Sequence, residues 1–293
     1  MIDFNGYIEK MAYYTSTQCN GINGELGNIK GLSYKLYQSA EQVRDVIVVY
    51  HGGGVNSQAG YQILAYQLCS MAPVAVCLVD IRGHGKSSGV RGNVDFPERI
   101  WRDVDIILQE MQVLFPQTRF YLFGHSSGAG MLLNYFTRHR PQHKVDGLFL
   151  LACELGPFAK LSRQSSSKIP FAEIKQWPFI VNALSKGLFY GQTLAVKLNF
   201  SEEALASMDG FVEYYSVNMS NAVTPRYPAK QLAALSVPTH FLIAEEDELF
   251  STSAMKKFST KYGSQYLKVS VLPGCSHLDC IFVAASYVYK NLT

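Results

Sequence analysis

The sequence predicts an α/β protein in which helices cover both faces of a mostly parallel sheet. Short apolar runs alternate with helical patterns from residue 45 to about residue 152, and the alternation returns after residue 238. Such alternation is typical of the strand–helix–strand units that build a parallel sheet. Between these parts the pattern is irregular and mostly helical. We therefore expect a core of residues 1–155 and 236–293, with a helical cap inserted at residues 156–235.

The expected strands are short runs of apolar residues. Residues 7–15 and 32–37 alternate between apolar and polar side chains, which predicts antiparallel strands, and glycines between positions 21 and 31 mark the loops. Runs that are apolar on both faces predict buried parallel strands. They are residues 45–50, 74–79, 119–123, 145–152, 239–244 and 267–272.

Apolar residues spaced three and four apart predict the helices. The expected helices are residues 59–70, 100–115, 127–138, 255–262 and 280–290. Inside the insertion, Pro170 and Pro178 can each open a helix, and the serines at positions 165–167 indicate a loop.

A Gly-His-Ser-Ser-Gly pentapeptide at residues 124–128 joins an expected strand to an expected helix. Its two glycines leave room for a sharp turn, which would push the Ser126 hydroxyl out at the carboxyl end of the sheet. The free N–H groups of the following helix can hold an oxyanion there. A glycine- and serine-rich turn without chemistry is the alternative. Ser127 is a rival nucleophile, but the spacing places Ser126 at the centre.

A serine nucleophile needs a base, and the chain has seven histidines. His277 differs from the others by its position, because it follows the last expected strand after Pro273 and Gly274. A loop there returns to the carboxyl edge of the sheet, where Ser126 is expected. We therefore choose His277 as the base.

The base needs a carboxylate that holds its tautomer. Four acidic residues at positions 245–248 follow the expected strand 239–244. We choose Asp247, because the loop must first leave the strand and then turn back. Glu154 is the rival, since it closes the preceding strand at the same edge. The resulting order of serine, aspartate and histidine is the order expected for one triad fold.

An oxyanion hole needs backbone N–H donors. The N–H of Ser127 follows the nucleophile directly. The His-Gly-Gly-Gly sequence at residues 51–54 ends an expected strand at the same edge. We choose Gly53 as the second donor, because glycines let the backbone approach a substrate closely. A glycine-rich strand end without a catalytic role is the alternative.

Composition limits the function classes. Of the 293 residues 17% are charged, the net charge is +3, and no run of Lys and Arg stands out, so a nucleic-acid partner is not indicated. The six cysteines show neither C-x-x-C nor metal-site spacing, which favours a reducing, cytoplasmic location. Residues 1–10 carry Asp3 and Glu9 and no apolar stretch, which argues against a signal peptide. We find no apolar run long enough to span a bilayer.

Together, the motifs resemble the α/β-hydrolase family, in particular its branch of monoacylglycerol lipases and lysophospholipase-like enzymes of the serine aminopeptidase S33 type. The resemblance rests on residues 51–54, 80–89, 91–96, 124–128, 237–247 and 274–277. It implies a mostly parallel, eight-stranded sheet and a triad of Ser126, Asp247 and His277. It also implies oxyanion donors at Gly53 and Ser127.

Two departures from the family pattern concern glycines. Ala129 follows the pentapeptide where the family often has a glycine, which is a mild change. In the turn before the acid, either Ala244 or Glu245 stands where the family usually has a glycine. The second departure leaves Glu246 as an alternative to Asp247.

The resemblance implies a serine hydrolase that cleaves a carboxylic ester, such as a monoacylglycerol, a lysophospholipid or a similar small acyl ester, through an acyl-enzyme on Ser126. Serine at this position argues against the haloalkane dehalogenase and epoxide hydrolase relatives, which use aspartate there. A thioesterase, a peptidase or an acyltransferase on the same triad is an alternative, as is a non-catalytic binding protein for a small apolar ligand. The expected chemistry needs no metal ion or organic cofactor.

Apolar side chains of the expected cap suggest a site for an acyl chain, and we also consider a transient contact between the cap and a membrane surface. Packing of the cap onto the core explains these side chains equally well. They are Phe171, Trp177, Phe179, Ile180, Leu184, Leu188 and Phe189. The sequence does not indicate an oligomeric state.

Overall fold

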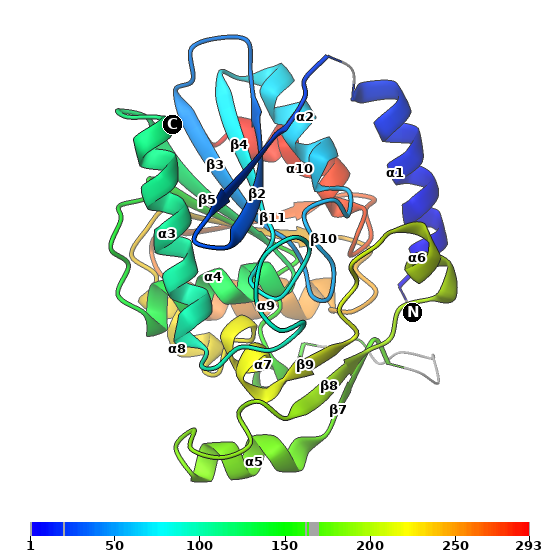
Figure 1. Ribbon diagram of the computed structural model, residues 1–293, viewed down its shortest axis with the longest axis vertical. Helices are drawn as coiled ribbons and strands as arrows, with labels where there is room; N and C mark the ends of the chain where they lie inside the picture. Colours follow the sequence, from blue (N-terminus) through cyan, green and yellow to red (C-terminus); the bar gives the residue numbers. More distant parts are fainter. Residues whose placement is uncertain (1, 20, 162, 164–169, 293) are drawn as a thin grey trace.

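The computed structural model describes residues 2–19, 21–161, 163 and 170–292 (Figure 1). Its centre is a sheet of eight strands in the order β1-β2-β4-β3-β5-β6-β10-β11. The strands are β1 (Glu25–Ile29), β2 (Leu32–Gln38), β3 (Asp45–Tyr50), β4 (Val74–Val79), β5 (Arg119–His125), β6 (Gly147–Leu151), β10 (Thr239–Ala244) and β11 (Leu267–Leu272). β2 runs antiparallel to both of its neighbours, and the pairs from β4 to β11 are parallel. The predicted α/β-hydrolase fold with a mostly parallel, eight-stranded sheet is therefore confirmed.

Two apolar clusters cover the two faces of this sheet. On β3, Val46 and Val48 belong to one cluster, whereas Ile47 and Val49 belong to the other. The first cluster contains side chains of α3 (Glu98–Leu114), α4 (Ser127–Arg138) and α9 (Thr252–Tyr262), and the second contains those of α2 (Tyr61–Met71) and α10 (Cys280–Tyr289). All residues of β3 and β4 are buried, as expected for parallel strands with both faces covered.

The register of the strands brings their carboxyl ends together. Tyr50 of β3 lies opposite Gly124 of β5, and His125 lies opposite Leu151 of β6. Further along, Ala244 of β10 lies opposite Leu272 of β11. The loops after β3, β5, β10 and β11 consequently start at one edge, which is where the predicted site residues lie.

The prediction for residues 7–15 was wrong, because they form part of a helix, α1 (Phe4–Gln18). Its apolar side chains recur at Phe4, Tyr7, Met11 and Tyr14, a spacing of three and four that fits one helix face. The Asp3 side chain accepts a hydrogen bond from the Gly6 N–H at 2.9 Å and caps the helix. This helical period decides the structure over the weaker alternation.

The partner of β2 is instead β1, which pairs with it in antiparallel register. Gly27 lies inside β1, although the sequence pattern places it in a loop. Other expected elements are confirmed: the strands 45–50, 74–79, 239–244 and 267–272 have the predicted bounds, and the five predicted helices begin and end within a few residues of the observed ones.

The proposed cap, residues 156–235, is only partly helical. It contains the helices η1 (Pro157–Ala159), α5 (Gln176–Leu184), α6 (Glu202–Ser207), α7 (Val217–Val223) and α8 (Pro228–Ala234). It also contains an unpredicted antiparallel sheet of β7 (Ala172–Ile174), β8 (Leu194–Leu198) and β9 (Tyr214–Ser216). These strands have three to five residues, too few to show a period. Figure 1 shows this sheet and α5 projecting away from the main sheet.

Smaller expectations for this region have mixed outcomes. Pro178 lies in the first turn of α5, as predicted, whereas Pro170 opens no helix. The serines at 165–167 lie outside the described residues. Outside this region, the side chains of Cys69, Cys77 and Cys153 are buried. Among the helices that the structure describes, none combines the length and the apolarity required to cross a membrane.

Candidate active site

Ser126 occupies the turn between β5 and α4 in a conformation that side chains rarely adopt. Its φ is 53° and its ψ is −116°, in the positive-φ region that is costly for a residue other than glycine. Hydrogen bonds fix the turn: the Ser126 N–H donates to Leu151 at 2.9 Å, and its carbonyl accepts from Ala129, Gly130 and Glu154.

The two glycines of the pentapeptide are required by close approach of backbone atoms. A Cβ at Gly124 would lie 2.6 Å from the Ala129 nitrogen, and one at Gly128 would lie 2.5 Å from the His51 carbonyl oxygen. The Gly-x-Ser-x-Gly pattern thus fulfils a steric condition of this turn, and the turn presents Ser126 at the carboxyl edge of the sheet.

The structure brings Ser126, His277 and Asp247 into one hydrogen-bonded line. His277 Nε2 lies 3.0 Å from Ser126 Oγ, and His277 Nδ1 lies 2.8 Å from Asp247 Oδ2. Because a carboxylate can only accept, Nδ1 carries the proton and Nε2 is left to accept the Ser126 proton. Both the histidine and the aspartate are 2% exposed. This is the arrangement of a nucleophile, a base and an acid.

The charges around His277 adjust its basicity. Burial alone would lower the pKa of His277, but the adjacent Asp247 carboxylate and its hydrogen bond raise it above the ordinary value, with smaller contributions from Glu248 and Glu154. Burial would likewise raise the pKa of Asp247, but His277 and the N–H groups of Phe250 and Leu249 lower it. The pair therefore favours a charged aspartate beside a histidine that readily takes a proton.

The other acidic residues have different partners. Glu154 accepts a hydrogen bond from the Gly156 N–H at 2.5 Å, and burial raises the pKa of Glu154. Glu248 accepts from the backbone N–H of His277 at 2.7 Å, and Glu245 accepts from that of Gly274 at 2.9 Å. Glu246 is exposed. The geometry thus places Asp247 at the imidazole, and its neighbours hold the backbone of the histidine loop.

The backbone N–H groups near Ser126 differ in their partners. The N–H of Gly52 donates to the Tyr61 hydroxyl, and that of Gly54 donates to the Tyr215 hydroxyl, both at 2.7 Å. Within the described part of the chain, the N–H of Gly53 has no protein acceptor. Ser127 is the first residue of α4, so its N–H has no partner within the helix. A Cβ at Gly53 would lie 3.1 Å from Ser127 Oγ, so the two residues are neighbours.

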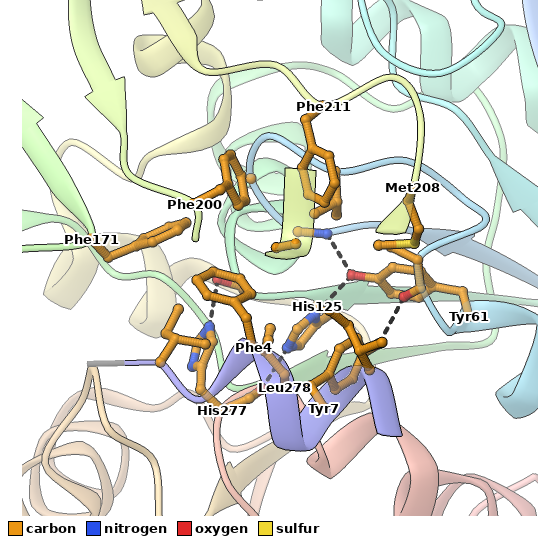
Figure 2. A pocket seen from close by; sticks show the side chains of 18 residues that line it. Phe4, Tyr7, Tyr61, His125, Phe171, Phe200, Met208, Phe211, His277 and Leu278 are labelled. Carbon is orange, nitrogen blue, oxygen red and sulfur yellow. Dashed lines mark hydrogen bonds between the residues drawn. The ribbon is translucent and has the colours of Figure 1, made fainter. Parts of the chain in front are cut away.

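An apolar pocket lies over Ser126 (Figure 2), and its walls come from α1, from the insertion and from loops of the main sheet. The apolar side chains in these walls are Ile2, Phe4, Tyr7, Ile8, Val55, Ala59, Tyr61, Phe171, Phe200, Ala204, Met208, Phe211 and Leu278. The Phe4 ring lies 6.3 Å from that of Phe171 and 5.7 Å from that of Phe200, between centroids. The cavity volume is about 40 Å³.

Of the cap residues that suggested an acyl site, only Phe171 lines this pocket. Phe179 packs against the core. The other five are exposed, which corrects the expectation that they would surround an acyl chain: Trp177, Ile180, Leu184, Leu188 and Phe189.

Sequence reasoning also missed the contribution of α1 and of the two tyrosines that hold the glycine loop. The helical spacing of Phe4, Tyr7, Met11 and Tyr14 is the signal that could have found α1. We see no local signal for Tyr61 or Tyr215, since their partners are distant in the sequence.

Comparison with known proteins agrees with this fold. A family model described as serine aminopeptidase, S33, matches residues 41–194. The chain is similar in structure to a soluble variant of monoglyceride lipase from Saccharomyces cerevisiae, with a TM-score of 0.69, 15% identity, and coverage of 94% of this chain and 96% of that chain. It is also similar to a monoacylglycerol lipase from Paleococcus ferrophilus, with a TM-score of 0.61, 18% identity, and coverage of 91% and 99%. At such identities the likeness concerns the fold alone.

In sequence, the chain is 28% identical over 141 residues to protein phosphatase methylesterase 1 of Candida albicans. The match covers 47% of this chain and 38% of that protein.

Proposed function

The chain belongs to the serine aminopeptidase S33 family of α/β hydrolases, and from that premise we propose that it is a serine hydrolase that cleaves carboxylic esters with an apolar acyl group. The observation that carries this proposal is the line from Ser126 Oγ through His277 to Asp247, with distances of 3.0 and 2.8 Å. Ser126 and His277 line an apolar pocket. The neighbouring N–H groups of Gly53 and Ser127 have no protein acceptor in the described chain.

In the proposed reaction, His277 Nε2 takes the proton of Ser126 as Oγ attacks the carbonyl carbon of the ester. The N–H groups of Gly53 and Ser127 stabilise the negative charge that develops on the carbonyl oxygen. His277 then gives the proton to the departing alcohol oxygen, which leaves an acyl-enzyme. A water molecule that loses a proton to His277 attacks this intermediate and releases the carboxylic acid, and the proton returns to Ser126.

The lining of the pocket supports an uncharged, apolar acyl group. Among its described wall residues there is no Asp, Glu, Lys or Arg. A free ammonium group of a peptide would lose its hydration there without gaining a charged partner, so an ester is favoured over an aminopeptidase substrate. The two monoglyceride and monoacylglycerol lipases of similar fold are in accord with this choice.

The small size of the cavity limits the length of the acyl group that fits without movement of its walls. A volume of about 40 Å³ holds only a few water molecules. A long acyl chain therefore requires the aromatic walls, of which Phe4, Phe200 and Phe211 are part, to move outward.

We also propose that the tip of the insertion makes transient contact with an anionic membrane surface. The exposed apolar residues of α5 and the loop after it are accompanied by Lys175, Lys186 and Lys197, and residues 174–201 contain no Asp or Glu. Apolar and basic side chains together are typical of segments that lie in a membrane interface. Co-sedimentation with anionic vesicles, reduced by Leu184→Glu and Leu188→Glu together, would support this contact. Equal recovery of the protein with and without vesicles would contradict it.

The test of the main proposal is hydrolysis of p-nitrophenyl esters of increasing acyl length, with Ser126→Ala as the control. We expect turnover that depends on Ser126, while the thermal transition of the variant stays close to that of the wild type. Preference for medium or long chains would indicate a lipid-like ester, and preference for acetate or butyrate a small-ester carboxylesterase. Turnover retained by Ser126→Ala would contradict the assigned nucleophile. If no ester were cleaved, thioesters and peptides would be tested next, and a binding protein would remain after them.

A further inference from the structure

We call residues 51–56, the glycine loop after β3, the oxyanion loop. Hydrogen bonds connect this loop to the insertion. Both polar atoms of the Gly54 backbone have partners there: its N–H donates to the Tyr215 hydroxyl at 2.7 Å, and its carbonyl accepts from the Val212 N–H at 2.8 Å. The Asn56 side chain adds a third bond, to the Asp209 carbonyl, at 3.0 Å. The segment 209–215 thus contacts the loop that carries Gly53.

The direction of the Tyr215 hydroxyl is fixed by a buried histidine. His84 Nδ1 lies 3.2 Å from the Arg82 carbonyl oxygen, and His84 Nε2 lies 2.7 Å from the Tyr215 oxygen. A carbonyl can only accept, so Nδ1 carries the proton and Nε2 accepts from Tyr215. The tyrosine oxygen is then free to accept from Gly54. Burial lowers the pKa of His84 to about 3, which keeps the ring neutral and this proton arrangement unchanged at working pH.

The opposite end of the loop is held by the same chemistry from the core. The Gly52 N–H donates to the Tyr61 hydroxyl at 2.7 Å, which lies 2.8 Å from His125 Nδ1. His125 Nε2 lies 2.9 Å from the carbonyl oxygen of His277. Each neighbour of Gly53 therefore donates to a tyrosine, and each tyrosine donates to a neutral histidine that is anchored on a backbone carbonyl. The Gly53 N–H lies between these two held groups and has no protein acceptor in the described chain.

We propose that Tyr215 is a positioning residue for the reaction: its hydroxyl holds Gly54 so that the neighbouring Gly53 N–H points at the developing oxyanion. This inference rests on the proposed function and makes the insertion a part of the catalytic apparatus. Hydrogen-bond donors that are fixed before the reaction stabilise an oxyanion more than donors that must first turn toward it.

The segment that carries Tyr215 is itself anchored to the core. The Ser216 N–H donates to the Gly92 carbonyl at 2.9 Å, and a Cβ at Gly92 would lie only 1.9 Å from the Tyr214 carbonyl oxygen. Residues 209–216 are thus held between the oxyanion loop and the loop around Gly92. A residue that positions another group must itself be held in place, and these contacts hold the backbone next to Tyr215.

The experiment compares Tyr215→Phe with Tyr214→Phe in the full chain. The first variant keeps the ring but leaves the Gly54 N–H without its acceptor and His84 Nε2 without its donor. The second removes the hydroxyl of a neighbouring tyrosine that is 46% exposed. For Tyr215→Phe we expect kcat to fall by about 10-fold or more with KM within about 2-fold, since the loss concerns the transition state. Affinity for a trifluoromethyl ketone, which forms a tetrahedral adduct with the serine, should fall by a similar factor.

A second measurement does not depend on turnover. Hydrogen exchange of a peptide that covers residues 51–57 should become faster in Tyr215→Phe and stay unchanged in Tyr214→Phe. If the wild type hydrolyses esters and both variants behave alike in kcat and exchange, the inference is overturned while the proposed function stands. If the wild type cleaves no ester, the proposed function fails, and the exchange of residues 51–57 alone decides whether Tyr215 holds the loop.

Discussion

Ser126 keeps a strained backbone because its surroundings determine it from several sides. A positive φ in a residue other than glycine costs about 1–3 kcal/mol, and four hydrogen bonds to the Ser126 peptide groups offset that cost. The strained turn places Ser126 Oγ 3.0 Å from His277 Nε2. Backbone strain at Ser126 is in keeping with its proposed role as nucleophile.

Asp247 provides a sharper test of the residue roles. Its Oδ1 accepts from the N–H groups of Leu249 and Phe250, at 2.8 and 2.9 Å. In Asp247→Asn these two donors would fix the amide oxygen at that position and turn the NH2 toward His277 Nδ1. The His277 proton would then move to Nε2, where it faces Ser126 and prevents action as a base. We expect kcat to fall by about 10³- to 10⁴-fold in the p-nitrophenyl ester assay.

Glu154→Gln is the matched control for this prediction. The carboxylate of Glu154 accepts from the Gly156 N–H, and the amide oxygen of glutamine can accept the same bond. We therefore expect kcat to change by less than about 10-fold, because only a minor contribution to the charge around His277 is removed. A larger loss in Glu154→Gln than in Asp247→Asn would move the acid to the end of β6.

At the level of helices and strands, the parallel part of the fold was predictable because its signals are local and long. Buried strands such as β3 and β4 are continuous apolar runs, and α3 shows its helical period over 17 residues. α1 was missed because its apolar stripe was taken for strand alternation, and β7 and β9 have only three residues each. The order of Ser126, Asp247 and His277 was readable from their places after strands, and their catalytic roles stay predictions.

The walls of the pocket could not be predicted for a different reason. Tyr215 contacts Gly54 although 161 positions of the sequence separate them. Phe4 of α1 contacts Phe200 of the insertion, and the two segments have no motif in common. Contacts of this kind are set by how elements pack, and a single sequence carries no local mark of them.

The helix α1 should therefore control which acyl groups enter. Phe4 lines the pocket and is buried, whereas Tyr13 on the same helix is 63% exposed. Removal of the Phe4 ring enlarges a cavity of about 40 Å³, so Phe4→Ala should raise kcat/KM for long acyl esters relative to short ones by several-fold. Tyr13→Ala should leave that ratio unchanged. The same ester ladder measures both variants, with the thermal transition as a check of folding. An unaltered ratio in Phe4→Ala would exclude Phe4 as a determinant of acyl length.

The residues of the candidate site come from distant parts of the chain and lie together at one edge of the sheet. Ser126 follows β5, Asp247 follows β10 and His277 follows β11, and the parallel register brings these ends together. The same edge receives α1 from the amino-terminal part and segment 209–216 from the insertion. Ligands of open α/β sheets bind at such carboxyl edges, so the placement follows from the topology itself.

Two buried histidines make the stability of the whole molecule depend on pH. Burial lowers the pKa of His84 and of His125 to about 3, whereas an unfolded histidine titrates near 6.5. Between about pH 3 and pH 6.5 these two histidines bind protons in the unfolded chain but not in the folded chain. Their contribution to the free energy of unfolding is therefore full above pH 6.5 and is lost as the pH falls toward 3. Each histidine then costs about 2 kcal/mol of unfolding free energy at pH 5. His277, Asp103 and Glu154, with raised pKa values, act in the opposite sense.

Urea unfolding at pH 7.5 and at pH 5.0 measures this loss directly. We expect the two histidines to outweigh the opposing groups and the free energy of unfolding to decrease by about 2 kcal/mol or more. His84→Gln removes one of the two titrating rings, and the amide oxygen of glutamine can still accept from Tyr215. In that variant the difference between the two pH values should shrink by about 2 kcal/mol. A difference between the two pH values that is the same in His84→Gln as in the wild type would show that His84 does not stay neutral in the folded chain. That result would contradict the fixed proton arrangement between His84 and the Tyr215 hydroxyl.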